Sequence, residues 1–324
     1  MIEEILPGLY KLILPLSGVF PVGINSYIVK SGERSLIIDV GWNRQPCMDS
    51  MMTGLKELKV NFAKTDFFIT HFHPDHLNLI ENLATDDSVV YFNRPEDEWM
   101  RSGFQWEDLV ALGHRNGFPD DEARAAIRQH PGYGHPLGRN LPFKSVSEDT
   151  LITMGNFTFQ CIETPGHAKR HMCLYEPHEK VFLSGDLILK DLITSIQSWW
   201  DEDNPMEEYL ASLDKVNGLD IARVLPGHGE VFNHCRQRIK ELKLHHQSRL
   251  DEIFSILRKG GMTAFQVASQ MSWDNGQKSI PWESLPLLFR WFTVGESIAY
   301  LRCLEERGMI SRETGGEKII YHSS

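Results

Sequence analysis

Seven histidine and aspartate residues follow short apolar runs, and their order restricts the possible folds of this chain more than any other feature. The run Phe67–Ile69 leads directly into THFHPDH, which contains His71, His73, Asp75 and His76. In an extended segment His71 and His73 project to the same side, and Pro74 then turns the chain. Because zinc-like ions bind imidazole nitrogen and carboxylate oxygen, the motif predicts donors for two neighbouring ions.

Three further donors occur later, each at the end of a predicted strand and beside glycine. The strands end in TPGHA, SGD and LPGHG, which present His167, Asp186 and His228. Small residues beside each donor allow the backbone to approach an ion closely. A lone His-x-His pair usually occurs by chance on a surface or in a core and binds no metal, but this ordered set predicts a binuclear metal site. We expect His71, His73 and His167 to bind the first ion, Asp75, His76 and His228 to bind the second, and Asp186 to bridge them.

The elements around these motifs predict a layered α/β domain over residues 1–235, because predicted strands alternate with predicted helices such as Met48–Lys59. Residues 94–148 interrupt this pattern. Apolar residues are sparse there, Gly, Pro and His are frequent, and Asp121–Gln129 has a short helical pattern. We therefore expect a helical cap inserted into the catalytic domain, placed over the metal edge, where it selects a bulky organic substrate.

A helical period replaces the alternating pattern after residue 235. One face repeats at steps of three and four residues and consists of Ile239, Leu242, His246, Leu250, Ile253 and Leu257. This repeat predicts a connecting helix within residues 236–261, with His246 packed at the domain interface.

The last part of the chain, residues 262–324, has signals for helices followed by a hairpin. Two sequences have the spacing of capping boxes, which begin helices: Thr263 to Gln266 and Thr293 to Glu296. Beyond Gly308, two short apolar runs flank Gly315-Gly316, a hairpin turn. Helices followed by a hairpin of this size predict a winged-helix-like domain.

The ordered motifs THFHPDH, TPGHA, LSGD and LPGHG resemble those of the metallo-beta-lactamase superfamily. DVGW also matches that family's early Asp-x-Gly, at Asp39 and Gly41. The resemblance covers roughly residues 1–235 and implies an α/β fold, a four-layer αββα sandwich with the metals at one edge between the two sheets. The tail resembles the winged-helix domain that is attached to one broad hydrolase branch of the superfamily.

This donor set favours metal-dependent hydrolysis. Two divalent ions, the carboxylates of Asp75 and Asp186 and a bridging hydroxide leave one net positive charge, which suits an oxyanion formed during attack on a carbonyl or phosphoryl centre. Metal binding lowers the pKa of water from 15.7 to about 7. The resemblance implies that Asp75 orients the hydroxide and accepts its proton. We expect cleavage of a thioester, lactone or related ester, with zinc as the metal and iron or manganese as alternatives.

Two other functions stay open at this point. Persulfide dioxygenases share much of the motif but use a single iron, so a mononuclear-iron oxidoreductase is one alternative. Some relatives with a similar tail cleave RNA, so an endoribonuclease or phosphodiesterase is the other. Yet residues 251–324 contain eight Lys and Arg against nine Asp and Glu, which is not the basic surface that nucleic acid requires. We expect a small-molecule substrate and no nucleic-acid partner, with the tail packed on the catalytic domain or forming a homodimer.

Composition predicts a cytoplasmic protein without a membrane segment. The chain has a net charge of −11, and 41% of its residues are hydrophobic. MIEEILPGLYKLILPL lacks the basic start of a secretory signal, and no apolar stretch approaches the roughly 18 residues of a membrane span. The five cysteines are scattered and form no disulfide framework.

Substrate specificity is expected in residues 94–148 and 187–204, where the resemblance is weakest. His171 lies where relatives often have a histidine near the pocket, so it either contacts ligands or substrate or belongs to a solvated loop. Trp199 and Trp200 follow the Asp186 loop and form either a pocket wall or ordinary packing.

Overall fold

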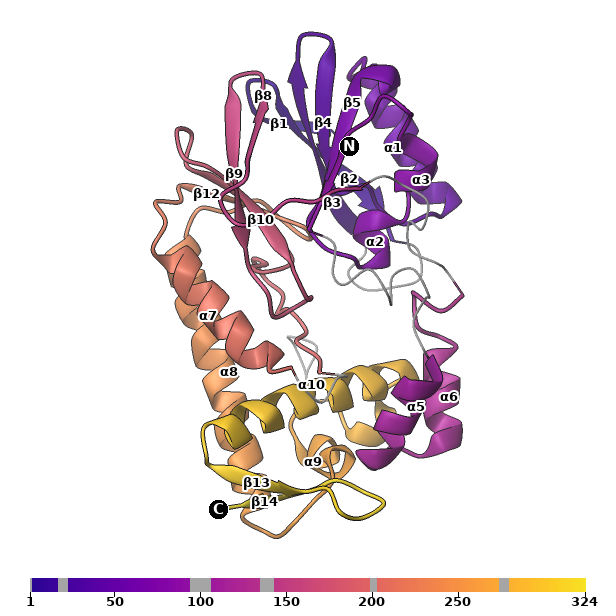
Figure 1. Ribbon diagram of the computed structural model, residues 1–324, viewed down its shortest axis with the longest axis vertical. Helices are drawn as coiled ribbons and strands as arrows, with labels where there is room; N and C mark the ends of the chain where they lie inside the picture. The colour runs from indigo at the N-terminus through magenta and orange to yellow at the C-terminus, as the bar shows by residue number, and fades with distance from the viewer. Residues whose placement is uncertain (1, 17–22, 94–105, 135–142, 199–202, 274–279) are drawn as a thin grey trace. The chain divides into compact units, whose positions relative to one another are not determined.

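The chain divides into two compact units. Figure 1 presents the computed structural model, which describes residues 2–16, 23–93, 106–134, 143–198, 203–273 and 280–324. The first unit comprises Met1–Gly103, Pro136–Thr194 and Ser212–Ile239, and the second comprises Phe104–His135, Ser195–Ala211 and Lys240–Ser324. Two unit boundaries therefore fall inside helices, α7 (Pro205–Asn217) and α8 (Cys235–Leu257).

Two sheets form most of the first unit. In the described residues one sheet has seven strands in the order β1 to β7, and the other has five in the order β12-β11-β10-β9-β8. The seven strands are β1 (Ile2–Leu6), β2 (Leu9–Pro15), β3 (Gly23–Ser31), β4 (Arg34–Ile38), β5 (Thr65–Ile69), β6 (Val90–Phe92) and β7 (Phe143–Lys144). The five are β8 (Leu151–Met154), β9 (Phe157–Glu163), β10 (Met172–Glu176), β11 (Val181–Gly185) and β12 (Arg223–Pro226).

Parallel pairing in both sheets brings several strand ends to one edge. Strands β4, β5, β6 and β7 pair in parallel, and so do β11 and β12, whereas the other neighbours are antiparallel. Parallel neighbours end at the same side of a sheet. Residues that directly follow β4 and β5 are therefore gathered at one edge of the first sheet, and those that follow β11 and β12 at one edge of the second.

A hydrophobic core lies between the two sheets. Leu36 and Phe68 come from the seven-stranded sheet, Phe159 and Leu183 come from the five-stranded sheet, and all four belong to one buried cluster. The remaining short helices of this unit are α1 (Gln45–Glu57), η1 (Phe62–Lys64), α2 (Pro74–Leu77) and α3 (Ile80–Leu83). Helix α1, which the sequence predicts near Met48–Lys59, packs against β2 and thereby covers part of its sheet.

The second unit combines inserted helices with the C-terminal part of the chain. Its elements are α5 (Trp106–Arg115), α6 (Asp120–Ile127), α9 (Ala264–Gln270), η2 (Trp282–Ser284), α10 (Leu287–Glu306), β13 (Ile310–Glu313) and β14 (Ile320–Ser323), together with parts of α7 and α8. Strands β13 and β14 form the antiparallel hairpin that the sequence predicts around Gly315-Gly316. No helix in the described ranges is long and apolar enough to span a bilayer.

The inserted helices pack on the C-terminal elements, which differs from the expected domain boundaries. The ring of Phe118 lies 5.2 Å from that of Phe265 and 5.3 Å from that of Trp291. The amide of Ile319 donates to the carbonyl of Arg115 at 2.7 Å. Burial of these large rings is favourable, and sequence patterns do not reveal which aromatic partner each one finds. The returning part of the segment contributes β7 to the first sheet, and the expected position over the metal edge stays a prediction.

The structure has a helix where the helical period begins after residue 235, and it has the first capping box. All six residues of the apolar face predicted for α8 are buried. At the start of α9, the amide of Gln266 donates to Thr263 Oγ1 at 3.2 Å, and the amide of Thr263 donates to Gln266 Oε1 at 2.9 Å. His246 is buried, and its Nδ1 lies 2.8 Å from the hydroxyl of Tyr300.

The second predicted capping box is wrong. Helix α10 begins at Leu287, so Thr293 lies inside it rather than at its start. The Thr293 hydroxyl instead donates to the carbonyl of Arg290 at 2.9 Å, a bond that threonine makes within a helix. Burial of Trp291 favours the earlier start, because the first turns then pack a large apolar side chain.

Replacing Gly117 by alanine is expected to lower the free energy of unfolding of the second unit by about 2–4 kcal/mol. Gly117 has a φ of +92°, and a Cβ there would lie 2.4 Å from Thr263 Oγ1, the cap of α9. Gly134→Ala is the matched control, since Gly134 has a φ of +73° but nothing within 4 Å of its Cβ position. Urea unfolding of both variants measures the difference. Equal effects would show that the close approach to Thr263 is unimportant.

Glu296→Gln is expected to stabilise the second unit above pH 7 and to have little effect at pH 4. Burial raises the pKa of Glu296 from 4.5 to about 7, with Arg249 opposing the shift. The folded state then binds more protons than the unfolded state between these values, so stability is fully present below pH 4.5 and falls as pH rises to 7. The loss is on the order of 1–3 kcal/mol for this half-buried group. Urea unfolding at pH 4, 6 and 8 tests this, and parallel wild-type and variant profiles would contradict it.

Candidate metal centre

The first four predicted donors lie immediately beyond β5. Every residue of β5 is buried, and His71 follows it after a single residue with 1% of its surface exposed. Pro74 then starts the short helix α2, as expected from the preference of proline for the first turn. This helix presents Asp75 and His76 on the turn after the strand.

The other three donors follow strands of the second sheet. His167 comes from the segment between β9 and β10, Asp186 follows β11, and His228 follows β12. The parallel pairing of β11 with β12 aligns Gly185 with Pro226, so Asp186 and His228 leave the sheet together. The amide of Met172 also donates to the carbonyl of Thr70 at 2.8 Å and joins the two sheets beside the site.

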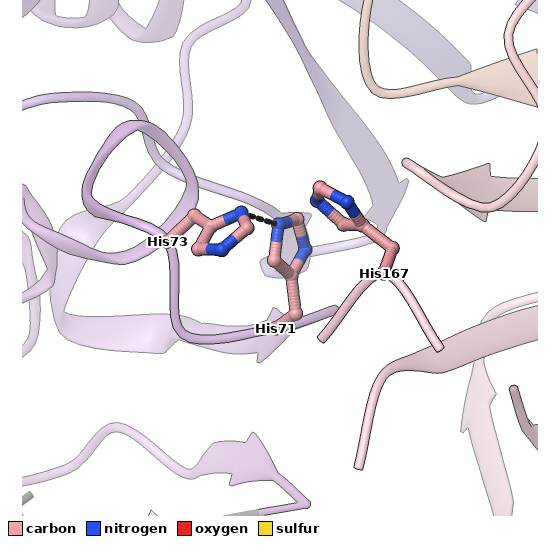
Figure 2. Close-up of side chains that lie close together, drawn as sticks. All are labelled: His71, His73 and His167. Carbon is pink, nitrogen blue, oxygen red and sulfur yellow. Dashed lines mark hydrogen bonds between the residues drawn. The ribbon is translucent and has the colours of Figure 1, made fainter. Parts of the chain in front are cut away.

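The seven predicted donors converge as three overlapping groups. In each group the ligand atoms all lie within 4.8 Å of one another: His71, His73 and His167; His71, His76 and Asp186; Asp75, His76 and His228. Figure 2 shows the rings of the first group turned toward one another, with His71 Nε2 and His73 Nδ1 2.9 Å apart. The first and third groups match the two sets expected from the sequence.

Asp186 occupies the position between the two outer groups. Its Oδ2 lies 3.7 Å from His167 Nε2, 3.5 Å from His76 Nε2 and 3.4 Å from His228 Nε2. Asp75 Oδ2 lies 3.3 Å from His228 Nε2 on the other side. One carboxylate therefore reaches members of both groups.

The carboxylates make this cluster attractive to positive charge. Burial lowers the pKa of His76, but Asp186, Asp39 and Asp75 together raise it well above its ordinary value. Burial also lowers the pKa of His228, but Asp186 and Asp75 outweigh burial and raise this pKa to about 10. Burial lowers the pKa of His71 and His73 far below the ordinary value, which keeps these rings neutral. Neutral imidazole is the form that binds a metal.

The residues present fit divalent metal ions. His76 Nε2 and Asp186 Oδ1 are buried polar atoms with no hydrogen-bond partner in the described part of the chain. Such atoms are rare unless a ligand satisfies them. The opposite ring nitrogens are occupied: His76 Nδ1 donates to Asp39 Oδ2 at 2.7 Å, and His228 Nδ1 donates to the carbonyl of Gly23 at 2.8 Å. This is the arrangement that fixes metal-binding histidines, and it directs both Nε2 atoms at the cluster.

Two glycines permit the close approach of the strand ends. A Cβ on Gly227 would lie 2.4 Å from Asp186 Oδ1 and 2.9 Å from the ring of His76. Gly185 has a φ of +46°, and a Cβ there would lie 2.7 Å from His171 Nε2. Gly185 of SGD and Gly227 of LPGHG are therefore required by space, as the sequence suggests.

Asp39, which belongs to the DVGW motif, and Thr70 support the donors, a role that no sequence pattern predicted. Asp39 Oδ1 accepts from the amide of Thr70 at 2.9 Å, and its Oδ2 accepts from the Thr70 hydroxyl at 2.8 Å as well as from His76. Asp39 directly follows β4, the parallel neighbour of β5. Its position at a strand end, like that of the other donors, is the signal that could have identified it.

His171 is a buried support and belongs to none of the three donor groups. Its Nε2 accepts a hydrogen bond from the amide of Asp186 at 3.2 Å, so the proton lies on Nδ1, which is 2.8 Å from the Thr164 hydroxyl. Burial lowers the pKa of His171 to about 3, so the ring stays neutral and keeps this acceptor. The expectation of a solvated loop histidine is therefore wrong. Trp199 and Trp200 lie outside the described residues.

The model of the metallo-beta-lactamase superfamily matches residues 19–228. The "Probable metallo-hydrolase YqjP" of Bacillus subtilis (strain 168) is 25% identical over 313 residues, which cover 93% of this chain and 94% of that protein. An "Atrochrysone carboxyl ACP thioesterase" of Aspergillus fumigatus is 24% identical over 220 residues, which cover 68% of this chain and 55% of the thioesterase.

A solved structure has the same fold over the whole chain. The metallo-beta-lactamase family protein of Thermus thermophilus superimposes with a TM-score of 0.81 at 24% sequence identity. The match covers 99% of this chain and all of that one. At this identity the likeness shows the fold alone.

Proposed function

This chain belongs to the metallo-beta-lactamase superfamily, and we propose that it cleaves a thioester, lactone or related ester at a centre of two divalent metal ions. It is a metallo-hydrolase of that superfamily, and the finer assignment concerns its reaction and its metals. The main support is the position of Asp186, whose Oδ2 lies within 3.7 Å of histidines from both outer donor groups. One carboxylate shared between two groups suits two ions better than one.

The proposed ligands are the seven residues expected from the sequence: His71, His73 and His167 for one ion, Asp75, His76 and His228 for the other, and Asp186 for both. Nitrogen and oxygen donors of this kind favour zinc, with iron and manganese as alternatives. When bound, such ions supply a nucleophile from water at neutral pH and polarise the carbonyl oxygen of the substrate.

Asp75 is proposed as the catalytic residue. Its side chain is 26% exposed, more than the 11% of Asp186 and the 4% of His228, so it is more accessible to a substrate than either of these donors. Burial opposes ionisation, but the charges of His76 and His228 hold the pKa of Asp75 below its ordinary value. The group is therefore a carboxylate at neutral pH. It can accept a proton from the attacking water and return it to the departing alcohol or thiol.

Thioester cleavage is favoured by the relative that is named a thioesterase and that covers 68% of this chain. We also propose that α9, α10 and the β13–β14 hairpin form a winged-helix-like domain, since two helices followed by a hairpin have that order. The slightly acidic balance of this region supports a role other than nucleic-acid binding.

A substrate panel tests the proposed reaction. Protein purified without added metal, and then loaded with zinc, iron or manganese, is assayed with acyl thioesters, lactones and phosphodiesters. The expected result is thioester or lactone hydrolysis that chelation removes and metal restores. Turnover of phosphodiesters alone would favour the nuclease alternative. Oxygen-dependent turnover of a persulfide with one iron per chain would favour the dioxygenase alternative.

A further inference from the structure

Strand β3 holds the turn that carries His228 through an unusual concentration of hydrogen bonds. The Asn25 side chain donates to the carbonyls of Pro226 at 2.9 Å and Gly229 at 2.8 Å. The Asn25 amide donates to the carbonyl of Gly227 at 2.7 Å. Three of the four carbonyls in the turn 226–229 are thus fixed by one residue.

Two other groups of β3 complete this contact. The Tyr27 hydroxyl donates to the same Pro226 carbonyl at 2.9 Å. The Gly23 carbonyl accepts from His228 Nδ1 at 2.8 Å. We call Gly23, Asn25 and Tyr27 the β3 clamp. Because β3 belongs to the first sheet and the turn follows β12 of the second, the clamp joins the two sheets at the metal edge.

The side-chain amide of Asn25 suits a position between two carbonyl oxygens. The side chain is buried, with 2% of the residue exposed, and both hydrogens of its amide nitrogen face carbonyl oxygens. Among side chains of this length, asparagine alone offers two neutral donors from one atom. An aspartate would have the same shape but would place an oxygen against both carbonyls. The site therefore discriminates between two nearly identical side chains.

The turn has little freedom to relax if the clamp is lost. Its Gly227 lies so close to Asp186 and His76 that no Cβ fits, and its amide donates to the Gly185 carbonyl at 2.7 Å. A shift of the turn away from β3 would therefore change where His228 Nε2 lies relative to Asp75 and Asp186. The Oδ2 atoms of these two carboxylates lie 3.3 and 3.4 Å from it.

We propose that Asn25, assisted by Tyr27, is a positioning residue that sets the place of His228 and thereby the affinity of the Asp75, His76 and His228 group for its metal ion. This inference rests on the proposed two-ion centre. It assigns Asn25 no contact with metal or substrate. Its effect is confined to one of the two ions, because the hydrogen bonds of the clamp hold the turn of His228 and not the His71, His73 and His167 group.

Zinc titration of metal-free protein against a chromophoric chelator measures the two binding steps separately. In Asn25→Ala and Asn25→Asp, we expect the affinity for one of the two equivalents, called the second equivalent below, to fall by about 10- to 100-fold, as is typical when support of a ligating histidine is lost. The affinity for the other equivalent should be unchanged. The two variants separate the effect of a displaced His228 from the effect of charge. The carboxylate added in Asn25→Asp would by itself strengthen cation binding, so weaker binding in both variants indicates displacement.

Two further variants control for stability. Val29→Ala removes buried apolar surface from the same strand and is expected to lower the melting temperature without changing either zinc affinity. Tyr27→Phe removes one donor to the Pro226 carbonyl and should weaken the second equivalent by less than the Asn25 variants do. Tyr27→Phe decides the question if the Asn25 variants do not fold, and an unchanged second equivalent would then overturn the proposal.

The outcomes distinguish this inference from the proposed function. Two equivalents in the wild type, with an unaltered second equivalent in folded Asn25 variants, would overturn the positioning role and leave the two-ion centre intact. Equal weakening of both equivalents would also overturn it, since the clamp would then act on the whole fold. A single equivalent in the wild type would overturn the two-ion centre and this inference together.

Discussion

Asp75→Asn is expected to lower kcat for the ester or thioester substrate by about 10²- to 10⁴-fold, the usual contribution of a positioned proton acceptor. Asparagine keeps an oxygen that can bind a metal ion, but it cannot accept a proton. Asp75 is the most exposed of the donors near His228, and its pKa is held below the ordinary value, so it is ionised when it is needed. Steady-state kinetics at saturating substrate, together with metal analysis of the same sample, separate the lost chemistry from lost metal.

Asp49→Asn is a suitable control for this substitution. Asp49 is a carboxylate on α1, hydrogen-bonded to Gln45 at 2.7 Å and remote from the donors in sequence, and the same change there should leave kcat unaltered. If Asp75→Asn kept its metal and its kcat, Asp75 would serve as a ligand only. A different proton acceptor would then have to be sought.

Gly227→Ala is expected to reduce kcat/KM by at least about 10²-fold, the scale of loss when reacting groups are displaced by roughly 1 Å. The added Cβ would lie 2.4 Å from Asp186 Oδ1, 2.9 Å from the ring of His76 and 3.1 Å from the Gly185 carbonyl. Two of these neighbours are proposed ligands, so either the turn or the ligands must move. Zinc binding should weaken together with activity.

Gly315→Ala is the matched control for Gly227→Ala, because Gly315 has open space at its Cβ position and no positive φ. It should change neither zinc binding nor kcat/KM. Kinetics and zinc titration of both variants provide the comparison. Full activity in Gly227→Ala would mean that the turn relaxes freely, which would conflict with the hydrogen bonds that hold it.

The convergence of the donors could be predicted because it depends on local sequence. Each donor follows an apolar strand, and glycine occupies positions where the backbone passes close to a donor, as Gly227 does beside Asp186. The hairpin at Gly315-Gly316 and the cap at Thr263 could be predicted for the same reason, since each depends on residues within a few positions of one another.

Supports that depend on remote residues could not be predicted in this way. Asn25 donates to carbonyls about two hundred positions later in the chain. His171 accepts from the amide of Asp186, which follows a different strand. No periodicity or spacing reports such pairs. At Thr293 a local pattern gave a wrong prediction. The sequence has the spacing of a capping box, but the helix begins earlier, at Leu287, where its first turns bury Trp291.

The grouping of the inserted helices also depends on tertiary packing. Phe118 has the same apolar character whether it packs on a sheet or on another helix, and only its partners Phe265 and Trp291 show that it belongs to the second unit. Within the expected insertion, Phe143–Lys144 instead form β7 and pair with β6 of the first sheet.

Metal analysis combined with anomalous scattering from crystals tests the central claim most directly. The measurement is made on protein purified without added metal and on protein reloaded with zinc. We predict two ions per chain in the reloaded protein, one beside His71, His73 and His167, the other beside Asp75, His76 and His228, with Asp186 in contact with both. A single ion in every preparation, with Asp75 and His76 unligated, would contradict the account and favour a mononuclear enzyme.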